Sequence, residues 1–168
     1  MTSPLDRMMD FDLTEEQRLV RRAVREFAEK EILPHVEEHE RAARYPLELI
    51  RKLVPLGYIA PMIPEEYGGS FSDVVTYGLI CEEIARVDWV VASVVSVSNS
   101  LVAGSILRFG TPAQKERWLP PMARGECITS AVLTETGGGT DLGNMATTAT
   151  RVDGGYRLNG TKVFISHA

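Results

Sequence analysis

The chain has 168 residues, of which 44% are apolar and 24% are charged, and its formal net charge is -5. This composition is typical of a globular protein that forms one ordinary domain or two small ones. The acidic balance, and the lack of a Lys/Arg stripe interleaved with aromatic residues, argue against nucleic-acid binding. Cys81 and Cys127 are isolated in the sequence, which favours reduced thiols over a metal motif. Residues 1–10 lack the apolar run of a secretory signal, so we expect a cytoplasmic protein.

Helix-start signals recur through the first 124 residues. Thr14, with Gln17 three residues later, forms the pattern of a capping box. Pro34 predicts a kink or an end of the helix that Thr14 opens. Pro46 suits the first position of a second helix, and Gly57 suits its stop.

Two further helix starts follow along the chain. Ser72 or Asp73 is placed to cap a third helix. Thr111 precedes a proline and a glutamine at capping-box spacing, and we expect Pro120 and Pro121 to end the helix that it opens. The first part of the chain is therefore predicted to be all-helical.

His35 and His39 lie one helical turn apart if the first helix continues past Pro34, and this spacing can hold a metal ion. Both histidines stand among charged residues, however, and no third ligand is in register with them. We therefore predict a solvated helix face and no metal site.

Segment 89–107 carries no charge over 19 residues, which is close to the length that crosses a bilayer. Five serines and an asparagine make it polar for a membrane span. Its valine content would also fit strands. We expect a helix of a protein outside the membrane, buried on nearly all sides.

The composition changes past Gly125. Runs 127–133, 147–152 and 156–165 are rich in β-branched and aromatic residues and predict strands. Asn159-Gly160 favours a type I′ hairpin turn. The predicted fold class is α+β by segment, with an all-α N-terminal domain and then an incomplete antiparallel β domain.

We place the boundary between residues 1–124 and 125–168. Three or four strands in the second part make only a small sheet with unprotected edges. The last predicted strand has no closing partner, so we expect a truncated chain.

A glycine-rich segment follows the first predicted strand. Thr134, Thr136 and Thr140 supply hydroxyl groups beside the glycine run 137–139. Glycines that turn through positive φ can point successive amides at a phosphorylated ligand. The alternative is a plain glycine-rich loop, because the segment lacks both a P-loop lysine and the dinucleotide glycine spacing.

Six motifs stand in one order along the chain: 13–17 (LTEEQ), 64–69 (PEEYGG), 82–88 (EEIARVD), 109–115 (FGTPAQK), 133–141 (LTETGGGTD) and 158–166 (LNGTKVFIS). In this order and spacing the chain, from about Phe11 to Ala168, resembles the N-terminal part of the acyl-CoA dehydrogenases. The resemblance implies the family's helical domain and the first part of its middle β domain. The family's C-terminal four-helix domain would be absent from this chain.

The resemblance implies FAD as cofactor and an acyl-CoA thioester as substrate. Thr134 would hydrogen-bond the flavin ring, and Leu133 would pack nearby. Gly139 and Thr140 would lie beside the FAD phosphates and the CoA thioester arm. Thr136 stands where the family usually has proline, which makes the turn less rigid.

The second motif that the resemblance identifies is Phe164-Ile165-Ser166. Phe164 would pack on the flavin, and the hydroxyl of Ser166 would reach the N5 side of the ring. Preorganised donors of this kind stabilise the negative charge that develops on a reduced flavin.

The resemblance assigns no catalytic residue to this chain. The family's catalytic carboxylate belongs to the C-terminal domain, so we expect the base beyond Ala168 and predict that residues 1–168 alone bind FAD poorly and are inactive. Glu135 and Asp141 are instead expected to fix the glycine turn by accepting backbone amides.

The family's acyl pocket is lined partly by the helix that matches segment 89–107. Val94, Val97 and Ser98 carry no charge that would pair with a second carboxylate. We therefore expect a monocarboxylic acyl chain and not a glutaryl-type substrate.

The implied partner is an electron-transfer flavoprotein, and the complete protein is expected to be a homotetramer or a homodimer. Two enzyme alternatives keep the fold but let oxygen reoxidise the flavin, as acyl-CoA oxidases and related flavin monooxygenases do. The third alternative is a short protein that uses the helical domain only for binding or assembly.

Overall fold

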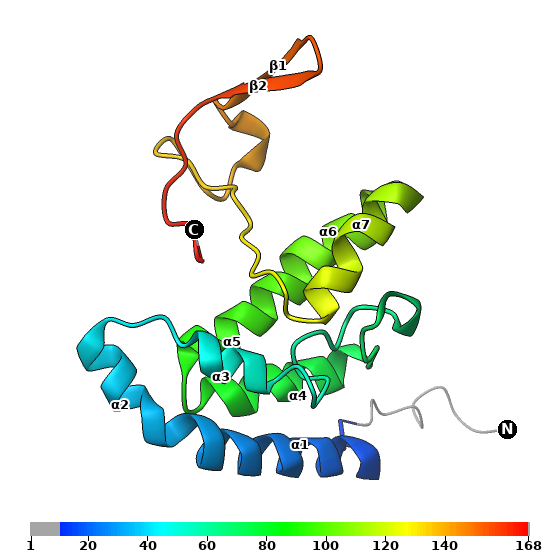
Figure 1. The fold of residues 1–168 in the computed structure, drawn as a ribbon, viewed down its shortest axis with the longest axis vertical. Coiled ribbons are helices and arrows are strands. Elements are labelled where there is room, and N and C mark those ends of the chain that lie inside the picture. Colours follow the sequence, from blue (N-terminus) through cyan, green and yellow to red (C-terminus); the bar gives the residue numbers. More distant parts are fainter. Residues whose placement is uncertain (1–10, 168) are drawn as a thin grey trace, which may run out of the picture.

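The computed structural model describes residues 11–167, so the leader-free N-terminus expected for residues 1–10 lies outside the described residues. Figure 1 shows the helices gathered in one body, from which a β-hairpin projects at the far end. In chain order the elements are α1 (Glu15–Phe27), η2 (Ala28–Ile32), α2 (Leu33–Ala42), α3 (Leu47–Lys52), η3 (Glu65–Tyr67), α4 (Val74–Ala85), α5 (Trp89–Ser96), η4 (Val97–Ala103), α6 (Gly104–Phe109), α7 (Pro112–Ala123), η5 (Leu142–Asn144), β1 (Thr148–Val152) and β2 (Gly155–Asn159).

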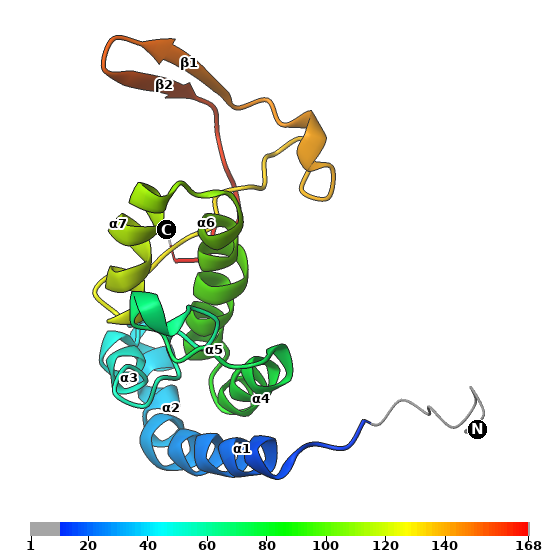
Figure 2. The same ribbon diagram turned by 90° about the vertical axis from the view of Figure 1, so that its right-hand side faces the viewer.

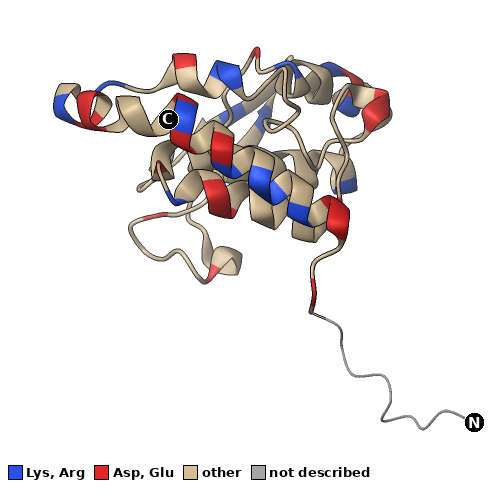
Figure 3. Ribbon diagram, turned by 90° about the horizontal axis from the view of Figure 1, so that it is seen from below, with Lys and Arg blue, Asp and Glu red and all other residues tan. Residues whose placement is uncertain are grey.

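One apolar core lies between the helices. Helix α4 packs between α1 and α5, and the α5–α6 helix extends from this layer toward the hairpin (Figures 1 and 2). Helix α1 turns charged residues of both signs outward, as Figure 3 shows. The largest fully buried apolar side chains are Val24, Ile32, Leu49, Leu53, Ile63, Ile84, Val91, Val94, Val95 and Leu119.

Three predicted helix starts are confirmed. Thr14 accepts a hydrogen bond from the backbone N–H of Gln17, whose side chain bonds back to the cap. Thr111 begins α7 with the same reciprocal pair. Asp73, the second of the two candidates for α4, accepts from the N–H groups of Val75 and Thr76. Each cap satisfies donors that have no partner inside the helix.

The prolines act differently from the prediction at two places. Pro46 is the N-cap of α3 and not its first residue, and α3 ends at Lys52, well before Gly57. Pro120 and Pro121 lie inside α7, which continues to Ala123. Their missing N–H groups fall in the last turn, where the affected carbonyls belong to exposed residues and remain open to water.

Pro34 falls in the first turn of α2, as a kink position requires. The five residues before α2, Ala28–Ile32, form a π-helix, so the chain passes the proline without leaving the helical path. The predicted kink is therefore a change of helix type between α1 and α2.

The uncharged segment forms one continuous helix through α5, η4 and α6. By length and composition alone, Trp89–Phe109 is long and apolar enough to cross a membrane. The predicted helix is confirmed, but burial on nearly all sides is wrong. One face packs into the core, whereas Trp89 on the other face is 73% exposed. The buried positions are Val91, Ala92, Val94, Val95, Ser98, Asn99 and Ala103.

Only one sheet is present among residues 11–167, the two-stranded antiparallel pair β1–β2. Val152 pairs with Gly155, so the turn is Asp153-Gly154, with Gly154 at φ +79°. The turn predicted at Asn159-Gly160 is wrong, because Asn159 ends β2 opposite Thr148. The strand predicted for 147–152 is confirmed within one residue.

The other two strand predictions need correction. The run 156–165 is a strand only to Asn159, and 127–133 is not a strand. The run 127–133 instead lies along the helices: Ile128 packs on their core, and the hydroxyls of Thr129 and Ser98 are 3.0 Å apart. Side-chain contacts with the helices thus hold this run in place of the backbone hydrogen bonds of a sheet.

Candidate functional site

The two segments that carry the predicted cofactor residues meet in space. The backbone N–H of Val163 donates to the carbonyl oxygen of Thr134 at 3.0 Å. The ammonium group of Lys162 donates to the carbonyl oxygen of Leu133 at 2.7 Å. Residues about 30 positions apart in the sequence therefore form one short contact. Thr134 and the Phe164–Ser166 segment are neighbours as a result.

Glu135 is the centre of this junction. Its carboxylate accepts the backbone N–H groups of Ala146 at 2.6 Å and Thr147 at 3.0 Å. Lys162 lies 2.9 Å from the same carboxylate. Hydrogen bonds from Thr147 and Lys162 lower the pKa of Glu135 to about 2. Glu135 therefore accepts backbone amides as expected, but they belong to Ala146 and Thr147 and not to the glycine turn, so the expectation that its carboxylate fixes that turn is wrong.

Asp141 does not share this role. Within residues 11–167 its carboxylate accepts no hydrogen bond, and only its backbone oxygen is used, by the N–H of Asn144. The expectation that Asp141 fixes the turn through its side chain is therefore wrong. The difference arises because the short helix η5 carries the chain away from the glycine run directly after Asp141.

The glycine run forms a tight turn that Glu135 and Gly138 close with two reciprocal backbone hydrogen bonds of 3.1 Å. None of the three glycines takes positive φ, so this part of the anion-cradle prediction is wrong. A Cβ on Gly137 or Gly138 would meet no atom within 4 Å. The backbone here is open on its outer side, where a ligand can approach it.

Several donors at this turn have no protein partner. In the described part of the chain, the N–H groups of Gly137, Gly139 and Thr140 make no hydrogen bond. The hydroxyls of Thr134 and Thr140 are likewise without a bond to another described residue. Neighbouring donors without partners suit a polar, anionic ligand.

The second motif presents its aromatic ring outward. Phe164 is 94% exposed and has a φ of +57°, which is uncommon for a bulky residue. Ser130 donates its hydroxyl to the carbonyl oxygen of Ser166 at 2.7 Å. Ile165 is half-buried, and the hydroxyl of Ser166 has no partner among residues 11–167. The motif thus has an exposed aromatic ring and, two residues later, a hydroxyl group without a partner among the described residues.

The three residues predicted for the acyl pocket occupy adjacent turns of the α5–η4 helix. Val94 and Ser98 are buried one helical turn apart, and Val97 is half-buried beside them. One residue that sequence reasoning missed connects this helix to the second motif. His167 lies 3.2 Å from the hydroxyl of Ser93, measured from Nε2. Nothing in the sequence pattern singles this histidine out.

The histidine pair on α2 corrects another prediction. His39 is only 5% exposed, so it is not part of a solvated face, although His35 is exposed. The Nε2 atom of His39 contacts Glu48 at 2.8 Å and Arg44 at 2.7 Å. Ala43, in the left-handed conformation, ends α2, and both partners of the ring come after this turn, Glu48 on α3 and Arg44 before it. Within residues 11–167 no group of three or more potential metal ligands is present.

Residues 14–126 match the family model of the acyl-CoA dehydrogenase N-terminal domain. An acyl-CoA dehydrogenase of Bacillus subtilis is 40% identical over 155 residues, which are 92% of this chain and 41% of that protein. A short-chain specific acyl-CoA dehydrogenase of Clostridium acetobutylicum is 40% identical over 95% of this chain and 42% of its own length.

Solved structures agree with the fold. Butyryl-CoA dehydrogenase of Megasphaera elsdenii superposes with a TM-score of 0.83 at 42% identity, covering 94% of this chain and 42% of that one. A glutaryl-CoA dehydrogenase of Mycobacterium smegmatis in complex with FADH2 superposes with a TM-score of 0.85 at 36% identity, covering 91% of this chain and 39% of that one. A chain from the structure of the electron transferring flavoprotein of Acidaminococcus fermentans superposes with a TM-score of 0.86 at 41% identity. The match covers 94% of this chain and 41% of that one.

The chain therefore spans about two fifths of the length of the relatives it matches. The family model covers most of the helical body, and the likeness to the Megasphaera elsdenii structure covers 94% of this chain. This chain belongs to the acyl-CoA dehydrogenase family.

Proposed function

We propose that the complete protein is an FAD-dependent enzyme that removes hydrogens from the α and β carbons of an acyl-CoA thioester. The observation that carries the proposal is the junction between Thr134 and Val163, which brings two sets of free donors to one edge. The family membership supplies the reaction class. Butyryl- and glutaryl-CoA dehydrogenases among the structural relatives support it.

The residues present fit a flavin nucleotide. Free amides at Gly139 and Thr140 suit phosphate oxygens, and the open outer side of Gly137 lets a ligand approach the backbone. The hydroxyls of Thr134 and Ser166 suit the polar edge of the ring. The relative that was solved with FADH2 supports a flavin as the cofactor.

Bound FAD supplies the acceptor for the hydride that leaves the β carbon. The chain's own contribution is binding and electrostatics. Thr134 and Ser166 hold donors where negative charge develops, and donors fixed in advance need no reorganisation during the reaction. Glu135 and Lys162 keep both donor segments in register. The catalytic base of the complete protein is proposed to come from the part that follows Ala168.

For the substrate we propose a monocarboxylic acyl chain. The residues predicted to line the pocket, Val94, Val97 and Ser98, have no charge, and the short-chain and butyryl-specific relatives support this class. A clear preference for glutaryl-CoA over butyryl-CoA and octanoyl-CoA would reject it.

For the electron acceptor we propose an electron-transfer flavoprotein, and the structural relative of that description supports this partner. We also propose a homodimer or homotetramer in the cytoplasm. Exposed large apolar side chains, such as Trp89 and Phe109, support the association of subunits.

The test uses the purified complete protein. We expect flavin absorbance that bleaches anaerobically with butyryl-CoA, and reoxidation by an electron-transfer flavoprotein without peroxide. Peroxide release in air would indicate an oxidase instead. Thr134→Val and Ser166→Ala should each slow bleaching about tenfold or more, because each removes one preorganised donor. Thr150→Val, on an exposed position of β1, is the matched control and should bleach at the normal rate.

A further inference from the structure

His167 bridges the second motif to the segment between α2 and α3 and to helix α5 at once. Its Nδ1 atom lies 2.9 Å from the hydroxyl of Tyr45, which precedes α3. Its Nε2 atom lies 3.2 Å from the hydroxyl of Ser93 on α5. The rings of Tyr45 and His167 also meet edge to face, with centroids 5.9 Å apart. Figures 1 and 2 both show the chain returning from the hairpin to the helices at this end.

The hydrogen bonds around the ring assign its tautomer. Ser93 already donates its hydroxyl proton to the carbonyl oxygen of Val90 at 2.8 Å. Ser93 must therefore accept from His167, which places the imidazole proton on Nε2. Nδ1 is then free to accept the hydroxyl proton of Tyr45. One neutral tautomer satisfies all of these groups, so the bridge needs no charge.

The backbone on either side is shaped for this bridge. Phe164 and His167 both have positive φ, at +57° and +64°. Histidine is among the residues enriched in this left-handed region. The segment between them is held at one end by the bond from Val163 to Thr134 and at the other by His167. Ser166, with its free hydroxyl, lies inside a loop that is fixed at both ends.

We propose that His167 is a positioning residue that fixes segment 164–166 against α5. This inference rests on the proposed function, because His167 would set the distance between the donors that face the flavin and the helix that lines the acyl pocket. Ser93 is adjacent to Val94 and one helical turn before Val97, so the bridge reaches the helix at the predicted pocket. His167 touches no reacting atom in this scheme and acts through Phe164 and Ser166.

The variants separate the two sides of the bridge. His167→Asn tolerates positive φ but is too short to reach both partners. Tyr45→Phe and Ser93→Ala each remove one partner and leave His167 in place. The matched controls are His35→Asn, an exposed histidine on α2, and Tyr156→Phe, an exposed tyrosine on β2.

The first readout does not depend on flavin. In the complete protein without cofactor, chymotrypsin should cut after Phe164 about fivefold faster in His167→Asn, because the loss of a hydrogen bond raises the population of the open loop. Cleavage after Phe109, which is also exposed, serves as the internal reference in the same digest. Tyr45→Phe should increase the cleavage rate less. Cleavage of the double variant Tyr45→Phe/His167→Asn should be little faster than that of His167→Asn alone.

The second readout uses the flavin-loaded protein. His167→Asn should lower kcat for butyryl-CoA about tenfold with little change in KM, because donors displaced by a fraction of an ångström lose transition-state stabilisation. Unchanged proteolysis and unchanged kcat in this variant would overturn the proposal. If the unaltered protein binds no flavin, the proposed function fails, while the proteolysis result still decides whether the bridge holds the loop.

Discussion

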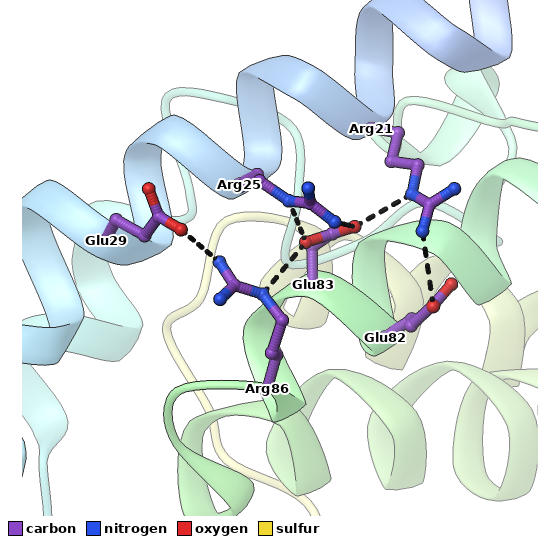
Figure 4. A network of polar contacts seen from close by, with 6 residues as sticks. All are labelled: Arg21, Arg25, Glu29, Glu82, Glu83 and Arg86. Carbon is purple, nitrogen blue, oxygen red and sulfur yellow. Dashed lines mark hydrogen bonds and ion pairs between the residues drawn. The ribbon is translucent and has the colours of Figure 1, made fainter.

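Arg25 on α1 donates two hydrogen bonds to the buried carboxylate of Glu83 on α4, at 2.7 and 2.9 Å. The Glu83 side chain is only 1% exposed, whereas that of Arg25 is 45% exposed. Arg21 and Arg86 complete the shell around the same carboxylate, as Figure 4 shows. Three partly solvated cations thus surround one buried anion. This arrangement ties α1 to α4 without burying the cations themselves.

We expect Glu83→Gln to lower the free energy of unfolding by about 2–3 kcal/mol, since the amide cannot replace charge-assisted bonds to three arginines. The measurement is urea unfolding followed by circular dichroism. Glu82→Gln, at the exposed neighbouring position, is the control and should change the free energy by less than about 0.5 kcal/mol. An equal effect of both substitutions would mean that the buried network does not carry the stability.

The same carboxylate predicts how stability depends on pH. The hydrogen bond from Arg25, ahead of the other contacts, lowers the pKa of Glu83 from 4.5 to about 2. A lowered pKa in the folded state means that the contribution is complete above pH 4.5 and is lost as the pH falls from there toward 2. The contribution is about 3 kcal/mol at neutral pH. The unfolding free energies of the unaltered protein and of Glu83→Gln should therefore converge over this range. A constant difference down to pH 2.5 would contradict the assignment.

Asn99 should be the most sensitive polar position in the α5–η4 helix. It is 2% exposed, and its amide donates to the carbonyl oxygens of Ile59 and Val95 while accepting the N–H of Met62. Asn99→Leu keeps the volume but leaves these buried backbone groups unpaired. We expect a loss of about 3 kcal/mol in unfolding free energy. Ser100→Ala, which removes an exposed bond to the carbonyl oxygen of Ser96, should cost less than about 0.5 kcal/mol.

Local signals in the sequence predicted the helices well and the β region poorly. Thr14, Asp73 and Thr111 are caps, and a cap is satisfied by residues two or three positions away, so short-range pattern suffices. The turn at Asn159-Gly160 was wrong because Asp153-Gly154 carries the same turn chemistry six residues earlier. Choosing between them depends on which strands pair, and that is not a local property.

The candidate site divides in the same way. A role for Glu135 as an acceptor of backbone amides was predictable, because it follows from the local motif. Its actual partners come from two places further along the chain, Ala146-Thr147 and Lys162. His167 and Tyr45 are 122 positions apart, and no periodicity or motif links them. The burial of His39 is not readable from α2 alone for a similar reason, since its partners Arg44 and Glu48 come after the turn at Ala43.

The junction predicts that Glu135→Gln weakens flavin binding. The amide keeps the shape of the side chain but loses the ion pair to Lys162, and its NH2 group would face the N–H of Ala146 or Thr147. We expect FAD affinity to fall about tenfold, because the two donor segments lose their common register. Flavin fluorescence of the complete protein measures the dissociation constant. Asp141→Asn, whose carboxylate accepts no bond within residues 11–167, is the matched control and should bind normally.

Gly160 and Gly155 should respond very differently to alanine. A Cβ on Gly160 would lie 2.2 Å from the hydroxyl oxygen of Thr147, and it would also approach the Thr147 backbone. Thr147 must then move, and its N–H is one of the donors to Glu135, so the disturbance passes to the junction. A Cβ on Gly155 would meet nothing within 4 Å. We expect Gly160→Ala to weaken FAD binding and to cost about 1–3 kcal/mol of stability, whereas Gly155→Ala should change neither. Since Gly155 begins β2 and Gly160 follows its last residue, equal effects would show that the hairpin itself, and not its contact with Thr147, controls the junction.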